Sequence, residues 1–262
     1  MTTRPVRPRD AATVMLVRDA PGGVEVYMLR RAPSMPFAPG AYAFPGGRVD
    51  ERDADRDVRW AGPPPGAWAR ILRTDERKAR ALVCAAVRET FEESGVLLAG
   101  PSEDAVVDDT RGEDWETDRA ALVDRTLSFA EMLARRGLVL RTDLLNAWSQ
   151  WITPAPEPRR FDTRFFAAGL PAGQQARDVG GEADRRAWMP PGEAVRLWRG
   201  GDIAMLPPTV STCMDLEAAG SVAAVMAAER EIAPIEPVLE QVGGETRIVV
   251  PEGVVYPRGE VR

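Results

Sequence analysis

The sequence of 262 residues contains no histidine, and this absence removes several common classes of catalytic site. A Ser-His-Asp triad, a Cys-His pair and a histidine-ligated zinc ion are all excluded. The two cysteines, Cys84 and Cys213, are too few for a thiolate metal cage and too far apart for a C-x-x-C redox motif. Any chemistry must therefore use carboxylates, lysine, arginine, tyrosine, serine, threonine or a metal ion held by oxygen atoms.

Long apolar runs are missing as well. No stretch of 18 apolar residues occurs, and the first ten residues carry charge and proline without an apolar segment. We therefore expect a cytoplasmic protein that does not act at a membrane. The formal charge of −6, from 34 basic and 40 acidic residues, argues against nonspecific binding of nucleic acid. It does not exclude an anionic substrate, provided that a metal ion or local arginines neutralise that substrate.

The first part of the chain has the pattern of strands and loops. Two β-prone runs, at 13–18 and 24–30, flank a Pro-Gly-Gly turn and predict a hairpin. A loop rich in proline and glycine follows over 32–47. It is expected to contain a short extended piece at 41–44 and a turn at 45–47.

The middle of the chain is expected to be helical around an insertion. The charge-rich and proline-rich segment 48–73 has the composition of an insertion without regular structure. Thr74 is then placed to cap a helix that ends at Gly95. A second helix is predicted over 118–136, whereas the pattern of 138–152 is ambiguous between helix and strand.

The last part of the chain mixes both kinds of element. The predicted elements are a buried strand at 160–170, a short strand at 187–189, a short helix after Pro190, a longer helix at 208–230, and weak strands near 238–242 and 246–250. Strands interleaved with helices predict an α/β layered fold, which we assign to a single domain over 1–262.

The stretch R-E-T-F-E-E-S-G that begins at Arg88 carries most of the chemical information. At about 100° per residue, Glu89, Glu92 and Glu93 share one helix face within one turn. These like charges repel each other, and a bound divalent cation would reverse the sign of the interaction. Arg88 lies four residues before Glu92, can pair with it, and is counted among the catalytic candidates. The glutamates alone are also typical of a solvated acidic face, but the F-P-G-G turn at 44–47 favours a site.

R-E-x-x-E-E-x-G with an upstream F-P-G-G resembles the Nudix box of Nudix hydrolases. The resemblance implies an α/β/α sandwich with a mixed sheet, and hydrolysis of a nucleoside diphosphate linked to another moiety. It also implies Mg²⁺ or Mn²⁺ held by Glu89, Glu92, Glu93 and the carbonyl of Gly46 or Gly47. Either Glu89 or Glu93 is then the general base.

The box is split, because about 27 extra residues separate Gly47 from Arg88. A split box resembles the branch that includes the peroxisomal coenzyme A diphosphatases of animals, as do residues 29–33 and 160–166. The resemblance implies hydrolysis of coenzyme A or acyl-coenzyme A to 3′,5′-ADP and a phosphopantetheine. Asp53 occupies the place of the first box glutamate and is assigned no role.

Further site candidates lie outside the box. Glu182 is a candidate metal ligand on a loop after a glycine pair, with Asp184 as its alternative. Arg30, Arg31 and Phe44 are candidates for substrate binding, since arginine can form a bidentate contact with phosphate. The segment 100–150 is expected to be a helical insertion or a cap over the site.

Two other functions stay open. Another Nudix substrate, such as NADH or ADP-ribose, fits the same motif, and so does a Nudix-like module that binds a nucleotide without catalysis. The only partner predicted is a small nucleotide substrate, without nucleic acid or membrane. The apolar helical region at 203–235 fits either an acyl pocket or the interface of a homodimer.

Overall fold

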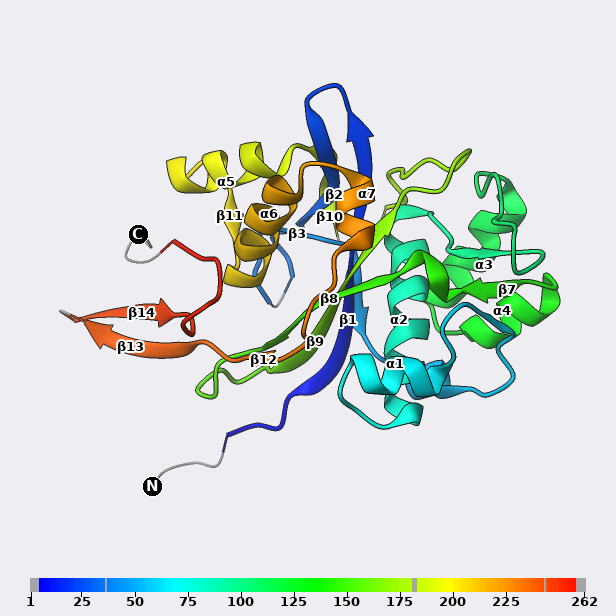
Figure 1. Ribbon diagram of the computed structural model, residues 1–262, viewed down its shortest axis with the longest axis horizontal. Helices are drawn as coiled ribbons and strands as arrows, with labels where there is room; N and C mark the ends of the chain where they lie inside the picture. The colour runs from blue at the N-terminus through cyan, green and yellow to red at the C-terminus, as the bar shows by residue number, and fades with distance from the viewer. Residues whose placement is uncertain (1–4, 36, 181–182, 243, 258–262) are drawn as a thin grey trace.

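The computed structural model describes residues 5–35, 37–180, 183–242 and 244–257. Within them, a nine-stranded mixed sheet has helices on both faces (Figure 1). The strand order is β11-β3-β2-β1-β9-β8-β12, with β4 attached to β1 and β10 attached to β2. The strands of this sheet are β1 (Arg9–Ala20), β2 (Gly23–Arg31), β3 (Ala41–Ala43), β4 (Gly46–Arg48), β8 (Asn146–Ile152), β9 (Phe161–Gly169), β10 (Ala183–Met189), β11 (Ala204–Met205) and β12 (Pro234–Ile235).

Helix α2 packs on one face of the sheet, and α5 and α6 pack on the other (Figure 1). The helices are α1 (Pro65–Ile71), α2 (Glu76–Ser94), α3 (Glu113–Val123), α4 (Phe129–Arg135), α5 (Pro191–Gly200), α6 (Pro207–Ala219) and α7 (Val222–Ala227), with 3-10 turns η1 (Glu51–Ala54) and η2 (Thr142–Leu144). The smaller sheets are β5 (Trp60–Ala61) with β7 (Val139–Arg141) and β6 (Ala99–Gly100), and the hairpin of β13 (Val238–Val242) and β14 (Glu245–Val249). The expected α/β/α sandwich is therefore the observed architecture.

Strand β1 shows why the sheet is covered on both sides. Val14 and Leu16 pack into the core beneath α2, and Met15 and Val17 pack into the core beneath α5 and α6. All four side chains are buried. Because successive residues of a strand face opposite sides, a strand that is apolar at every position needs a layer on each face.

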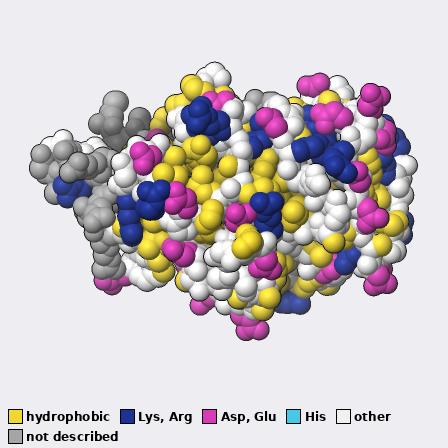
Figure 2. All heavy atoms as spheres, turned by 90° about the horizontal axis from the view of Figure 1, so that it is seen from above, with side chains coloured by type: hydrophobic (Ala, Val, Ile, Leu, Met, Phe, Trp, Pro, Cys, Tyr) yellow, Lys and Arg dark blue, Asp and Glu magenta, His cyan; other side chains and the backbone are white. Residues whose placement is uncertain are grey.

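The chain presents charges of both signs on its upper face, with hydrophobic side chains between them (Figure 2). The net negative charge is thus not concentrated on that face. Within the described ranges, every helix is too short or too polar to span a membrane.

The long helix α2 carries the acidic motif. Its N-cap is Asp75, whose side chain accepts a hydrogen bond from the backbone N–H of Lys78, so the assignment of the cap to Thr74 was wrong by one residue. The helix ends at Gly95 as predicted. Gly95 has a φ of 72°, a left-handed conformation that glycine adopts without strain.

Several strand predictions are confirmed, and some are extended. The hairpin of β1 and β2, the strand β9 and the tail strands β13 and β14 all occur. The predicted turn at 45–47 is wrong, because Gly46 and Gly47 lie in β4 and pair with β1. A side chain at Gly46 would lie 2.5 Å from the carbonyl oxygen of Ala12, so glycine permits this close pairing.

Two predicted long helices are each divided in the structure. The helix expected over 118–136 is α3 followed by α4, and Ser128 caps α4 between them. The helix expected over 208–230 is α6 followed by α7, because Gly220 ends α6 in a left-handed conformation. The segment 48–73 is also more regular than expected: it contains η1, β5 and α1. Proline at the first position of α1 is compatible with a helix.

Candidate active site

Helix α2 and strand β4 bring the predicted glutamates together with the glycine pair. The side chain of Glu93 accepts a hydrogen bond of 2.8 Å from the backbone N–H of Gly46. A Cβ atom on Gly47 would lie 2.6 Å from the carboxyl carbon of Glu89. The missing side chain of Gly47 therefore lets the Glu89 carboxylate of α2 lie directly against β4. Glu92 lies on the same face of α2 and lines the same cavity.

Arg88 binds three carboxylates at once. Its Nε and Nη2 atoms each donate to Asp53 at 2.9 Å, and its Nη1 atom donates to Glu89 at 2.8 Å and to Glu92 at 2.9 Å. The guanidinium also donates to the carbonyl of Arg48. The predicted pairing of Arg88 with Glu92 is therefore confirmed, and Arg88 fixes two of the predicted metal ligands.

Asp53, which was assigned no role in the sequence analysis, belongs to this site. It is 3% exposed, lies in η1, and accepts a hydrogen bond from the backbone N–H of Asp50 in addition to the two from Arg88. The available sequence signal was that Asp53 aligns with the position of the first glutamate of the Nudix box. The contact between Asp53 and Arg88 joins residues that are 35 positions apart, so no local sequence pattern predicts it.

Burial makes this cluster unfavourable for negative charge. It raises the pKa of Glu89 to about 7 and also raises the pKa values of Glu92 and Asp53. The neighbouring Arg88 guanidinium opposes this rise but does not cancel it. Three carboxylates that share one guanidinium leave an excess of negative charge in a poorly solvated place, and a further cation would relieve it.

The donor chemistry fits a divalent metal ion. Carboxylate oxygens are the ligands that Mg²⁺, Ca²⁺ and Mn²⁺ prefer. Among the described residues, no three acidic side chains converge closely enough to enclose an ion. Arg88 accounts for part of this arrangement, since its Nη1 atom binds both Glu89 and Glu92. Glu182 lies outside the described residues, so its predicted role is not addressed by the structure.

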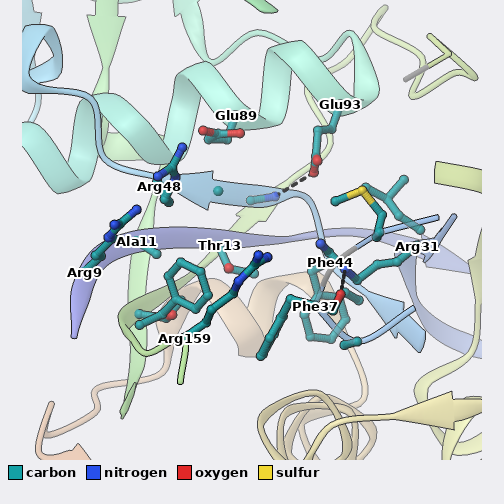
Figure 3. Close-up of a pocket in the computed structure, with 18 of the residues that line it drawn as sticks. Arg9, Ala11, Thr13, Arg31, Phe37, Phe44, Arg48, Glu89, Glu93 and Arg159 are labelled. Carbon is teal, nitrogen blue, oxygen red and sulfur yellow. Dashed lines mark hydrogen bonds between the residues drawn. The ribbon is translucent and has the colours of Figure 1, made fainter. Parts of the chain in front are cut away.

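The acidic cluster opens into a cavity of about 1390 Å³ (Figure 3). Of the substrate-binding candidates, Phe44 and Arg31 line this cavity. The Nε atom of Arg31 donates to the carbonyl of Phe37 at 3.0 Å and thereby holds the preceding loop. Arg30 is not among the cavity-lining residues, since its strand neighbours Leu29 and Arg31 face the cavity, and it forms an ion pair of 2.5 Å with Asp184. Asp184, the alternative candidate for a metal ligand, is therefore already paired with Arg30.

Comparison with known proteins agrees with this geometry. A profile of the NUDT19 Nudix domain matches residues 74–216. The chain belongs to the Nudix hydrolase family. Nudix hydrolases generally use divalent metal ions, and the resemblance drawn from the motif is confirmed.

Curated Nudix relatives carry a more specific name. The chain is 29% identical over 218 residues to acyl-coenzyme A diphosphatase NUDT19 of Xenopus laevis, covering 70% of this chain and 57% of that protein. It is also 29% identical over 223 residues to the Homo sapiens protein of the same name, covering 71% of this chain and 58% of that protein. The chain thus spans less than two thirds of the length of these relatives.

A solved Nudix structure confirms the fold. The crystal structure of a NUDIX hydrolase from Alicyclobacillus acidocaldarius superposes with a TM-score of 0.75 at 30% identity. The match covers 86% of this chain and 98% of that one. The α/β/α architecture with a mixed sheet is therefore a Nudix fold.

Proposed function

We propose that this chain hydrolyses the diphosphate linkage of coenzyme A or an acyl-coenzyme A to give 3′,5′-ADP and a phosphopantetheine. The observation that carries the proposal is the cluster of Glu89, Glu92, Glu93, Asp53 and Arg88 at the wall of a large cavity. The names of the curated relatives support the choice of substrate. A cavity of this volume also accommodates a ligand larger than most drug-sized molecules.

We assign a different task to each part of the cluster. Glu89, Glu92 and Glu93, with a peptide carbonyl of Gly46 or Gly47, would hold Mg²⁺ or Mn²⁺. A bound divalent cation supplies neutralisation of the diphosphate and lowers the pKa of water. Arg88 and Asp53 position the carboxylates of Glu89 and Glu92.

Glu89 is the better of the two candidates for the general base. In the metal-free protein, burial raises the pKa of Glu89 to about 7, the direction that suits a proton acceptor near neutral pH. Glu93 is instead held by the N–H of Gly46, and this hydrogen bond suits a residue with a fixed orientation. In this assignment, water attacks one phosphorus of the diphosphate, Glu89 takes the proton, and the other phosphate leaves.

Substitution of Glu93 tests the assignment. Glu93→Gln retains an oxygen that can accept from Gly46, so we expect a folded protein whose turnover falls by at least about 100-fold at saturating Mg²⁺. Glu76→Gln is the matched control, because Glu76 is an exposed acid at the other end of α2. Near-normal turnover of Glu93→Gln would show that Glu93 is not a central ligand.

A substrate panel tests the function itself. Coenzyme A, a long-chain acyl-coenzyme A, NADH and ADP-ribose are supplied with Mg²⁺ or Mn²⁺, and the products are identified by mass. We expect release of 3′,5′-ADP from the two coenzyme A compounds. Preference for NADH or ADP-ribose would identify a different Nudix pyrophosphatase, and no turnover of any compound would favour a binding module.

A further inference from the structure

Three arginines line the cavity at neighbouring strand ends. Arg9 begins β1, Arg48 ends β4, and Arg159 lies two residues before β9. Figure 3 shows Arg9 and Arg48 side by side at one end of β4 and draws Arg159 below β1. In the sheet, β1 lies between β4 and β9, so the three side chains come from three adjacent strands.

The strand register shows which face of the sheet Arg9 and Arg48 occupy. In β1, Arg9 and Ala11 line the cavity, whereas Ala12 packs into the core beneath α2. Arg48 pairs with Ala11, and Gly47 pairs with Ala12. Because paired residues share a face, the register places Gly47 on the side of the α2 glutamates and the backbone of Arg9 and Arg48 at positions of the other side, while Figure 3 draws the Arg48 side chain reaching from the end of β4 toward the side of α2.

The outer edge of β4 borders the cavity. Among the described residues, β4 pairs with β1 alone, and the cavity is lined by residues from both sides of it. Gly46 and Gly47 form most of β4 and carry no side chains at this edge. A substrate can therefore place its diphosphate near the glutamates and its remaining part near the arginines.

Within the described ranges, Arg9, Arg48 and Arg159 have no side-chain partner. None of them makes a side-chain hydrogen bond or an ion pair with another described residue. Other arginines of the same cavity bind acceptors within the chain, such as Arg31 with Phe37, Arg52 with Asp50, Arg88 with Asp53 and Arg160 with Glu236. Arg7 and Arg125 share the lack of a side-chain partner among the described residues. The row at the strand ends therefore offers unused donors to an anion.

Spacing along the strands separates this row from the cleaved bond. Gly46, which binds Glu93, pairs with Thr13 of β1. Arg48 lies two residues beyond Gly46, or about 7 Å along β4, and Arg9 lies four residues before Thr13, or about 13 Å along β1. Measured along the backbone, Arg48 and Arg9 therefore lie beyond the glycine that contacts Glu93.

Aromatic rings accompany the arginines. Phe37 and Phe161 line the same cavity, are half-buried, and meet edge to face with 5.6 Å between their centres. Such rings offer an apolar surface for a nucleobase. Free arginines beside aromatic rings suit a nucleoside that carries a phosphate more than they suit an uncharged acyl chain.

We propose that Arg9, Arg48 and Arg159 form a subsite for a phosphomonoester on the nucleoside half of the substrate, separate from the diphosphate that is cleaved. This inference rests on the proposed function, in which that group is the 3′-phosphate of coenzyme A. Guanidinium groups bind such a dianion through paired hydrogen bonds. The row thus selects coenzyme A over dinucleotides that have a free 3′-hydroxyl.

Coenzyme A and 3′-dephospho-coenzyme A, which differ only in this phosphate, give the test. We expect wild type to prefer coenzyme A in kcat/KM by about 10-fold or more, and Arg48→Ala and Arg159→Ala to lose most of that preference. The loss should fall on coenzyme A, with the rate on the dephospho compound within about threefold of wild type. Arg199→Ala, an exposed position on α5 away from the cavity, is the control.

An equal loss on both compounds, or no preference in wild type, overturns the subsite while leaving the proposed function intact. If neither compound is cleaved, the proposed function fails. Calorimetric measurement of nucleotide binding then tests the subsite separately. Tighter binding of 3′,5′-ADP than of 5′-AMP, abolished by Arg48→Ala, supports it. Equal binding of the two nucleotides overturns it.

Discussion

At the scale of single residues, Arg88 organises the acidic cluster. Its guanidinium is 11% exposed and contacts carboxylates from two distant parts of the chain, Asp53 in η1 and Glu89 and Glu92 on its own helix. Hydrogen bonds to these acids raise the pKa of Arg88, so it stays charged at every accessible pH. A buried charge of this kind is stable only while its partners remain.

Asp53→Asn removes one of those partners. Asparagine can accept only one of the two hydrogen bonds from Arg88 as a neutral group, so we expect the free energy of unfolding to fall by about 1–3 kcal/mol in urea. Turnover should also fall, because Arg88 is then balanced by Glu89 and Glu92 alone. Glu51→Gln, an exposed acid in the same turn, should leave both quantities near wild type. Wild-type stability of Asp53→Asn would show that Arg88 does not depend on Asp53.

At the scale of elements, α4 supports the turn that contains Asp53. Ser128 and Glu131 form a capping box at its first turn, and α4 lies against η1. Ser128→Ala leaves the backbone N–H of Glu131 without its side-chain acceptor, so we expect a loss of about 1 kcal/mol in the free energy of unfolding. Turnover should stay close to wild type. Ser102→Ala, at an exposed turn, is the control, and equal melting of the two variants would contradict the role of the cap.

Local patterns predicted the elements that local forces decide. The hairpin of β1 and β2, the strand β9 and the end of α2 at Gly95 follow from apolar runs, turn residues and a stop signal. The division of the helix at 118–136 also had a signal, since S-x-x-E at Ser128 is a capping box, but the apolar spacing on either side hid it. The glycine pair of β4 was mistaken for a turn because pairing with β1 is a long-range contact.

The site divides in the same way. Glu89, Glu92 and Glu93 share a face because helix geometry alone places them there, and the pairing of Arg88 with Glu92 spans one helical turn. The contact of Arg88 with Asp53 and the row of Arg9, Arg48 and Arg159 depend on how distant strands are ordered in the sheet. Sequence spacing carries no information about such neighbours.

At the scale of the whole molecule, the buried acids couple folding to pH and to cations. Unfolding exposes Glu89, so its pKa returns from about 7 to its ordinary value of 4.5. Between these values the folded state binds more protons than the unfolded state, and the free energy of unfolding therefore falls as pH rises from about 4.5 to 7. The raised pKa values of Glu92 and Asp53 act in the same direction. Acids with lowered pKa values, such as Asp50 at about 2, act below this window.

This linkage predicts that stability without metal declines by up to about 3 kcal/mol from pH 5 to pH 8, as measured by urea unfolding in the presence of a chelator. A divalent cation binds the ionised acids, so added Mg²⁺ or Mn²⁺ should raise the free energy of unfolding more at pH 8 than at pH 5. Glu89→Gln should flatten the decline and weaken the effect of the cation. The control Glu76→Gln keeps the buried acid and should retain both. A cation effect that is equal at the two pH values would show that the ion does not bind at Glu89. The metal site would then lie elsewhere than on this face of α2.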